Sequence, residues 1–217
     1  MKKIGILTAM SGEAVSIVEA LPEEIRCNIL SVTTGIGKVN AAMGALEMIL
    51  GQRPDCILSI GCAGSMGPMV PAEILIADRV AYHDVWCGAD VGFGRIQGCP
   101  QFFEADASLL AAAGEVGGES VRKGLLVTGD QFFLSEEEDA RILGLYPGAL
   151  AADMESAAIA QVCSRYGVPF LSCRIISDSH TSSELQKETY NEFWDSDLSQ
   201  YVKFVASLVS VISRSSI

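Results

Sequence analysis

Hydrophobic positions along the chain fall into two alternating kinds of segment. Short apolar runs are followed by longer stretches whose apolar residues recur every three or four positions, the spacing of a helix face. Because several of the short runs are almost continuously apolar, their strands are expected to be buried on both faces. The pattern predicts strands at 2–9, 27–35, 55–61, 73–86 (one long strand or a bent pair), 122–130, 148–153 and 168–178.

The longer segments predict helices at 12–21, 38–50, 105–116, 135–146, 154–166 and 191–213. One of them opens on Ser135 with Glu138 three residues later, the pattern of a capping box at a helix start. Strands that alternate with helices favour an α/β fold, with a mainly parallel sheet covered on both sides. The last helix is expected to bury a face made by Leu198, Val202, Val205, Val209 and Ile212.

Composition limits the class of protein. The 217 residues are 49% hydrophobic, which is enough for one core in a single domain over 1–217. The formal net charge is −12 with only 15 Lys and Arg residues, and this acidity argues against binding to nucleic acid or to an anionic membrane surface. We therefore expect a small-molecule ligand.

Neither a membrane segment nor a metal site is expected. The opening residues lack the apolar core of a signal peptide, and no apolar run approaches the length that spans a bilayer. The seven cysteines are scattered without a C-x-x-C pair and are expected to be reduced core thiols of a cytoplasmic protein. Because His83 and His180 are the only histidines, a zinc site built on histidines is not expected. The sequence also implies no other metal and no organic cofactor.

Polar residues follow the ends of several predicted strands. Met10 and Glu13 come after the first strand, the stretch GCAGS comes after the third, and Asp178 ends the last. Ligands bind at the carboxyl ends of strands in such sheets, so these groups are expected to converge on one cleft. Together with Glu155 they would make that cleft acidic.

The stretch AADMESAAIA, residues 151–160, carries two carboxylates on an alanine-rich segment. On a helical wheel Glu155 aligns with the apolar positions Ile159, Val162 and Tyr166, whereas Asp153 points the opposite way and is expected to cap the helix. The wheel thus selects Glu155 as the inward-facing carboxylate.

Arg174 lies inside the apolar run FLSCRIIS, where an unpaired charge would be costly. A carboxylate partner is therefore expected, and Glu155 is a candidate.

Each candidate also has a purely structural interpretation. Glu13 could be a first-turn glutamate favoured by the helix dipole. The stretch GCAGS could be a tight turn whose glycines supply positive φ. Asp178 could close a strand as a cap, and His83 is expected to be a structural histidine bonded to Asp84. The stretch TGIGKVNAA only partly matches a dinucleotide fingerprint, because Asn40 replaces the third glycine.

Eight stretches carry a pattern known from one enzyme family. They are ILTAM with Glu13, TGIGKVNAA, SIGCAGS, YHDVW, GCPQFFEAD, VTGDQFF, ADMESAAIA and CRIISD. In this order, from residue 2 to 178, they resemble the 5′-methylthioadenosine/S-adenosylhomocysteine nucleosidases of the nucleoside phosphorylase/hydrolase superfamily. DMES and RIISD at their mutual spacing are quite specific.

The resemblance implies three layers, with a central twisted mixed sheet that is mainly parallel and flanked by helices, and it implies a homodimer. It implies hydrolysis of the bond between adenine N9 and ribose C1′ in methylthioadenosine, S-adenosylhomocysteine and 5′-deoxyadenosine. By the same resemblance Asp178 is the general acid that protonates N7 of adenine, and Glu13 positions and activates the attacking water.

The resemblance also assigns substrate-binding positions. Glu155 would bind the ribose hydroxyls, Met154 would pack against the sugar, and Arg174 would orient Glu155. The backbone around Phe132 and Phe133 would bond the adenine edge, with a ring stacked on the base. The other positions carried over are Met10, Ile36 and Tyr190 or Phe193 around the 5′-alkylthio group, together with Cys62 and Ser177.

The chemistry of the bond agrees with these roles. Carboxylates stabilise the positive charge that develops on the sugar, and adenine leaves readily only after N7 is protonated by an acid of raised pKa. A phosphorylase would bind phosphate with arginines, but the first 25 residues contain none and Glu13 would repel the anion. Hydrolysis is therefore expected.

Three alternatives stay open: a hydrolase for another 5′ group, such as aminodeoxyfutalosine or futalosine hydrolase; a purine nucleoside phosphorylase; and a non-catalytic nucleoside-binding protein. The chain departs from the family pattern in a shorter 23–37 segment, at Cys62, where many members have a hydroxyl residue or valine, and in the 86–94 loop. The 5′ substituent is consequently the least determined feature.

Overall fold

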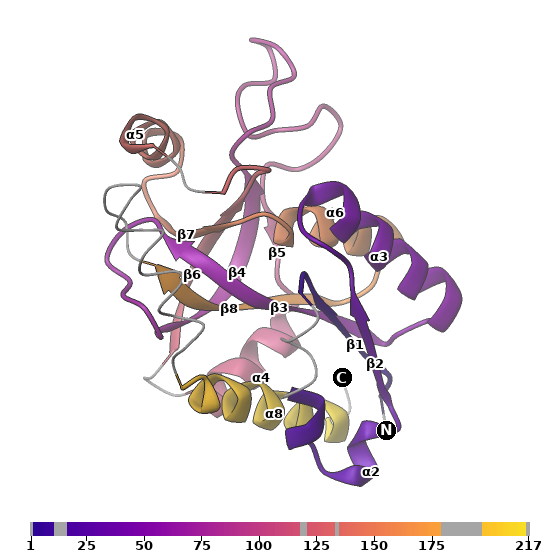
Figure 1. The fold of residues 1–217 in the computed structure, drawn as a ribbon. Coiled ribbons are helices and arrows are strands. Elements are labelled where there is room, and N and C mark those ends of the chain that lie inside the picture. The colour runs from indigo at the N-terminus through magenta and orange to yellow at the C-terminus, as the bar shows by residue number, and fades with distance from the viewer. Residues whose placement is uncertain (1, 11–16, 118–120, 133–134, 179–196, 216–217) are drawn as a thin grey trace.

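The computed structural model describes residues 2–10, 17–117, 121–132, 135–178 and 197–215 (Figure 1). Residues 17–20 of the predicted first helix are helical, while its beginning lies outside the described residues. The predicted start of the last helix, at 191, also lies outside them.

In the described part of the chain, one mixed sheet contains eight strands: β1 (Ile4–Thr8), β2 (Ile29–Thr33), β3 (Cys56–Ser65), β4 (Ile74–Tyr82), β5 (Phe103–Glu104), β6 (Val121–Thr128), β7 (Ala149–Asp153) and β8 (Phe170–Asp178). The order β2–β1–β3–β8 forms one parallel group. A second parallel group contains β4, β6 and β7, with β5 antiparallel at the edge of β4.

Two antiparallel contacts join these groups into a ring, β3–β7–β6–β4–β8. One contact joins β4 to β8. The other joins β3 to β7 through only two registered pairs, Gly64 with Ala152 and Ser65 with Ala151. Because β3 and β7 meet at their last residues, the carboxyl ends of the two groups lie together.

Helices cover both faces of the sheet (Figure 1). They are α2 (Glu23–Arg26), α3 (Lys38–Gln52), α4 (Ala107–Gly117), α5 (Glu136–Leu145), α6 (Ser156–Tyr166) and α8 (Ser199–Arg214). One layer pairs α3 with α6, and the layer on the other face pairs α4 with α8. The predicted three-layer α/β fold with a mixed sheet is confirmed.

Alternation along the strands explains why their sequences are almost wholly apolar. Ile4 and Ile6 of β1 join the core beneath α8, while the next residue, Leu7, joins the core beneath α3 and α6. On β3, Leu58 and Ile57 divide in the same way. Successive side chains point to opposite faces, so a strand covered on both sides needs apolar residues at every position.

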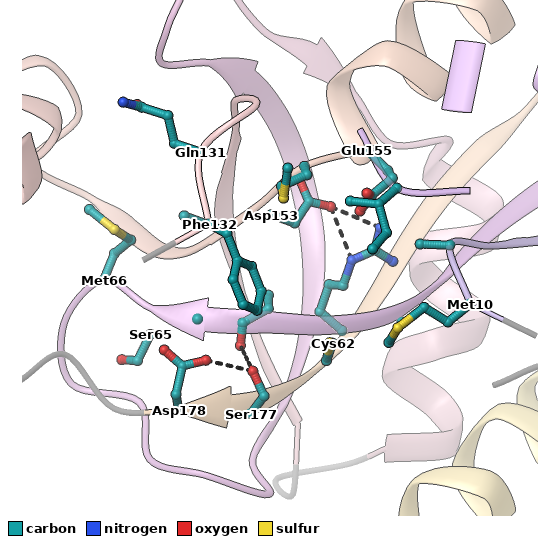
Figure 2. Close-up of a pocket in the computed structure, with 18 of the residues that line it drawn as sticks. Met10, Cys62, Ser65, Met66, Gln131, Phe132, Asp153, Glu155, Ser177 and Asp178 are labelled. Atoms are coloured by element: carbon teal, nitrogen blue, oxygen red, sulfur yellow. Dashed lines mark hydrogen bonds and ion pairs between the residues drawn. The ribbon is translucent and has the colours of Figure 1, made fainter. Parts of the chain in front are cut away.

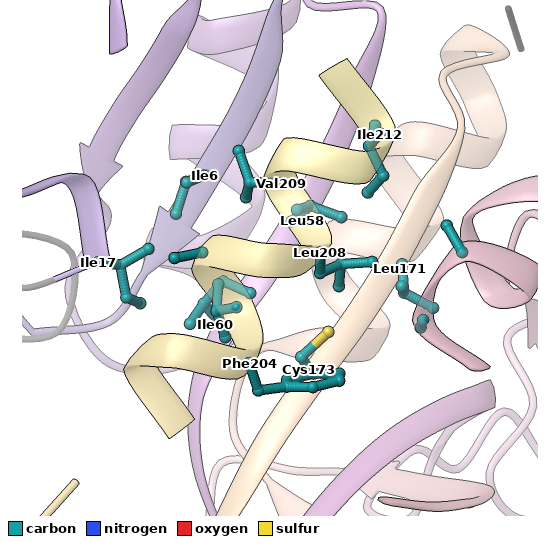
Figure 3. Close-up of a cluster of buried hydrophobic side chains, with 14 of the residues drawn as sticks. Ile6, Ile17, Leu58, Ile60, Leu171, Cys173, Phe204, Leu208, Val209 and Ile212 are labelled. Atoms are coloured by element: carbon teal, nitrogen blue, oxygen red, sulfur yellow. The ribbon is translucent and has the colours of Figure 1, made fainter. Parts of the chain in front are cut away.

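Helix α8 closes one layer of the core (Figure 3). Val205, Val209 and Ile212 are fully buried there, and Leu198 and Val202 pack against the same cluster. The face predicted from the spacing of its apolar residues is confirmed. A helix long and apolar enough to cross a membrane is not found among the described residues.

Three local features differ from the sequence expectation or were missed by it. The stretch GCAGS is not a turn, because β3 continues through it to Ser65. Neither α2 nor β5 was predicted, since four and two residues are too few to show a period.

The capping box is confirmed: Ser135 Oγ accepts the Glu138 N–H at 3.3 Å, and the Glu138 carboxylate accepts the Ser135 N–H at 3.0 Å.

Candidate active site

A cavity of about 450 Å³ opens where the strand ends meet (Figure 2). Its walls come from the residues after β1, the end of β3, the loop after β6, the junction of β7 with α6, and the end of β8. Strands from both parallel groups therefore contribute to one site, as expected for an α/β sheet.

A β-bulge places Ser177 beside Asp178 at the end of β8. The register with β3 jumps from Ala63↔Ile176 to Gly64↔Asp178, so Ser177 is an extra residue in the strand. Ser177 Oγ donates to Asp178 Oδ1 at 2.6 Å and is 3.3 Å from the carbonyl oxygen of Ala63. Both Ser177 and Asp178 line the cavity although they are neighbours in a strand.

Gly64 is needed here because of a close approach. A Cβ at this position would lie 3.1 Å from Asp178 Oδ2, which is tighter than nine in ten real Cβ contacts. Gly64 is not among the residues with positive φ, so the interpretation of this stretch as a turn is wrong for a second reason. The missing side chain makes room for the carboxyl group.

Burial favours the protonated form of the Asp178 carboxyl group. The residue is 8% exposed, and loss of solvation raises its pKa above the ordinary value, with the Ser177 hydrogen bond opposing the shift. Among the described residues that line the cavity, Asp139, Asp153 and Glu155 are also acidic and Arg174 is the one basic residue.

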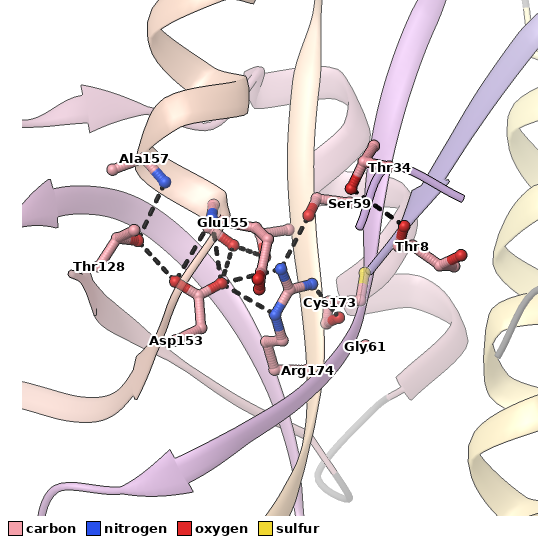
Figure 4. A network of polar contacts seen from close by, with 12 residues as sticks. Thr8, Thr34, Ser59, Gly61, Thr128, Asp153, Glu155, Ala157, Cys173 and Arg174 are labelled. Atoms are coloured by element: carbon pink, nitrogen blue, oxygen red, sulfur yellow. Dashed lines mark hydrogen bonds and ion pairs between the residues drawn. The ribbon is translucent and has the colours of Figure 1, made fainter. Parts of the chain in front are cut away.

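Arg174 has the carboxylate partner that its burial requires, and that partner is Asp153 (Figure 4). The guanidinium meets Asp153 Oδ2 at 2.8 Å through Nη2 and at 3.0 Å through Nε. Its remaining donors reach Ser59 Oγ at 2.8 Å and the carbonyl of Cys173 at 3.1 Å. Both side chains of the pair are almost fully buried.

Asp153 also closes the start of α6. Its carboxylate accepts the Ser156 N–H and hydroxyl, and it accepts the Thr128 hydroxyl at 2.6 Å. Asp153 thus binds the first N–H of α6, although the residue at the N-cap position is Glu155. The outward direction taken from the helical wheel is wrong. Asp153 belongs to β7 rather than to the helix, so helical angles do not apply to it.

Glu155 is buried at the boundary between β7 and α6 and lines the cavity. Its Oε1 accepts the backbone N–H of Gly37 at 2.9 Å. Gly37 is the residue immediately before α3, so a carboxylate lies against the positive end of that helix. The wheel correctly placed Glu155 inward.

Most of the other predicted site residues line the same cavity. The ring of Phe132 extends toward Ser177 and Asp178 and is 51% exposed (Figure 2). The other predicted residues found in the lining are Met10, Ile36, Cys62 and Met154. Those predicted residues that lie outside the described part of the chain are Glu13, Phe133, Tyr190 and Phe193.

Several lining residues were not predicted. Met66 follows β3, and Gln131 precedes Phe132 and donates to Glu138 Oε1 at 2.6 Å. Asp139 is 2% exposed in the first turn of α5. The capping-box sequence predicted where α5 begins, but it did not indicate that the first turn of α5 faces a cavity.

His83 does not form the expected bond with Asp84. It is fully buried, and neither ring nitrogen has a hydrogen-bond partner among the described residues, with burial lowering its pKa. Asp84 instead bonds Lys38 and the backbone N–H of Asp130. No cluster of three or more His, Cys, Asp or Glu that could hold a metal occurs in the described ranges.

Not all the thiols lie in the core. Burial raises the pKa of Cys56, Cys163 and Cys173 to about 12, whereas Cys27 and Cys87 are exposed. The expectation of core thiols therefore holds for some of the seven cysteines only.

Replacing Arg174 with Met would leave the Asp153 carboxylate buried without its cation. We expect the free energy of unfolding, measured in urea, to fall by about 3–5 kcal/mol. Arg165→Met, on the exposed side of α6, is the matched control and should change it by less than about 0.5 kcal/mol. Adding Asp153→Asn to Arg174→Met should restore part of the loss; full additivity of the two changes would contradict the pairing.

Comparison with known proteins identifies the family to which the chain belongs. Residues 3–212 match the family model "Phosphorylase superfamily". A 5′-methylthioadenosine/S-adenosylhomocysteine nucleosidase from Exiguobacterium sp. is 32% identical over 98% of this chain and 99% of its own length.

Solved structures agree with this placement. The Neisseria meningitidis nucleosidase of the same name, in complex with methylthio-immucillin-A, superposes with a TM-score of 0.87 at 29% identity, covering 96% of this chain and 99% of the other. Futalosine hydrolase of Helicobacter pylori gives 0.87 at 30% identity, covering 96% and 97%. The chain belongs to the phosphorylase superfamily and, within it, to the family of the 5′-methylthioadenosine/S-adenosylhomocysteine nucleosidases.

Proposed function

We propose that the protein hydrolyses the N-glycosidic bond of 5′-methylthioadenosine and S-adenosylhomocysteine, releasing adenine and the thioribose product. The observation that carries this proposal is Asp178, a buried carboxyl group of raised pKa on the wall of an acidic cavity. A protonated carboxylic acid in such a place can donate to N7 of a purine as the bond to C1′ breaks. The nucleosidases among its relatives support the choice of substrate.

The sugar side of the cavity is suited to a cationic transition state. Glu155 and the Asp153–Arg174 pair lie on this side, and a carboxylate in a poorly solvated site stabilises positive charge that develops on the ribose ring. We infer that Glu155 binds the ribose hydroxyls. Phe132, which is 51% exposed and lines the cavity, offers a face on which adenine can stack.

Water rather than phosphate is the proposed nucleophile. Phosphate recognition calls for cationic groups that are free to bind it. The one basic residue among the described lining residues, Arg174, is bound to Asp153 and Ser59. The role of activating the water is assigned to Glu13, which lies outside the described residues, and this assignment rests on the family resemblance.

A futalosine-type substrate is the second candidate, because futalosine hydrolase of Helicobacter pylori matches this fold as closely as the nucleosidase does. The candidate substrates differ in the 5′ group and, for futalosine itself, also in the base. Met10 and Ile36 contribute apolar surface at the proposed 5′ end of the cavity. That surface favours an alkylthio group.

We also infer that residues 1–217 form a single nucleosidase domain acting as a cytoplasmic homodimer in methionine salvage. Seven free cysteines suit a reducing compartment. Val39, Met43 and Leu50 expose between 54% and 69% of their surface on α3, at helical spacing. Such an apolar helix face is typical of a surface that a second copy covers.

The direct test is to incubate the purified protein with methylthioadenosine, S-adenosylhomocysteine, 5′-deoxyadenosine, aminodeoxyfutalosine and futalosine, each with and without phosphate. Free base, measured by chromatography, should appear fastest from methylthioadenosine and at the same rate without phosphate. Release that requires phosphate would contradict hydrolysis. Release from the futalosine compounds alone would select the second candidate.

Asp178→Asn should lower kcat by about 10²–10⁴-fold, because an amide cannot protonate N7. In the wild type, kcat should fall as pH rises through the raised pKa of Asp178. The buried charge lowers stability above that pKa, so the variant should be at least as stable as the wild type at neutral pH, and this difference should shrink as pH falls through it. Unchanged turnover would remove Asp178 from the mechanism.

Met43→Glu should shift a dimer toward monomers, because it places a charge on the exposed apolar face of α3. Val70→Glu is the matched control, since Val70 is equally exposed but lies outside α3. Sedimentation velocity measures the mass of each. A wild-type monomer, or equal masses for all three proteins, would rule out this interface.

A further inference from the structure

Two carboxylates from different sides of the cavity share the start of α3. Gly37 donates its backbone N–H to Glu155 Oε1 at 2.9 Å, and the next residue, Lys38, donates its backbone N–H to Asp130 Oδ1 at 2.8 Å. Glu155 is on the proposed sugar side. Asp130 directly precedes Gln131 and Phe132, which line the proposed base side. The first turn of α3 is therefore a physical link between the two halves of the site.

The side chain of Lys38 tightens this link. Its Nζ lies 2.5 Å from Asp84 Oδ2 and 3.7 Å from Asp130 Oδ2. Asp84 Oδ2 in turn accepts the backbone N–H of Asp130 at 2.9 Å. The base loop is thus held at Asp130 by its backbone and by its side chain, and one ammonium group lies between two carboxylates.

The geometry leaves little freedom in this arrangement. Gly37 has a φ of +94°, a conformation that L side chains rarely adopt, and a Cβ there would lie 3.1 Å from Asp130 Oδ1. The side chains of Lys38 and Asp84 are only 22% and 17% exposed, so solvent screens their interaction less than that of a surface pair. A displacement of Asp130 would consequently disturb its bond with the Lys38 N–H at the start of α3.

We propose that Lys38, Asp84 and Asp130 are positioning residues that couple base binding at Phe132 to the placement of Glu155 on the sugar. This inference rests on the proposed function. When adenine holds the Gln131–Phe132 loop, Asp130 fixes the first turn of α3, and Gly37 then presents its N–H to Glu155 in the orientation that receives the ribose. Base and sugar therefore bind cooperatively, because the second ligand meets a site already ordered by the first.

The cooperativity can be measured with the two reaction products. Isothermal titration calorimetry gives the Kd of adenine with and without saturating 5-methylthioribose. In the wild type the sugar should tighten adenine binding by at least about 5-fold, the lower end of usual coupling between sites. In Lys38→Met this factor should fall below about 2-fold, while the Kd of adenine alone changes by less than about 3-fold, because Phe132 is retained.

Matched variants separate coupling from folding. Lys38→Arg keeps a cation between the carboxylates and should retain most of the factor, and Lys203→Met, on the exposed side of α8, should leave it unchanged. Asp84→Asn keeps an acceptor for the Asp130 N–H but removes the charge. It provides a second measurement, with the same expected loss, if Lys38→Met fails to fold by circular dichroism.

The proposal is overturned if the wild type shows no cooperativity, or if Lys38→Met retains it. It is also overturned if the variant weakens adenine binding equally with and without the sugar, because that would be a local effect on the base loop. These outcomes differ from failure of the proposed function, in which the wild type releases no base from any nucleoside of the panel.

Discussion

The ion pair between Arg174 and Asp153 is the constraint around which the site is built. A charge inside an almost continuously apolar strand is tolerated only with an opposite charge and enough hydrogen bonds, and Asp153, Ser59 and the Cys173 carbonyl supply them. Because Asp153 also binds Thr128 and the first residue of α6, this one pair fixes β6, β7, β8 and the helix that follows Glu155.

The chemistry depends on two further departures from regular sheet structure. The bulge at Ser177 changes which face of β8 its last residues use, and Gly64 on the neighbouring strand leaves space for the Asp178 carboxyl group. Poor solvation follows from this close packing, and poor solvation is what raises the pKa of Asp178. The raised pKa of Asp178 thus depends on strand register as much as on residue type.

Much of the fold was predictable because it follows from periodicity. The seven predicted strands, the capping box at Ser135 and the buried face of α8 all express patterns that extend over several residues. Periodicity carries no information about the register of strands or about where strands and helices begin and end. The wheel therefore placed Glu155 inward correctly but misplaced Asp153, which is the last residue of β7. For Arg174 the sequence offered Glu155 as a candidate partner, and the structure pairs its guanidinium with Asp153. The bulge at Ser177 leaves no trace in a one-dimensional pattern.

The ring of strands closes at its weakest point beside the cavity. Only two registered pairs join β3 to β7, whereas β3 and β8, and β4 and β6, each share eight. Backbone hydrogen bonds that belong to so short a ladder open with little cooperative resistance. Within the ring, we therefore expect local opening to be easiest at Gly64, Ser65 and the facing alanines, next to the strand end that carries Asp178.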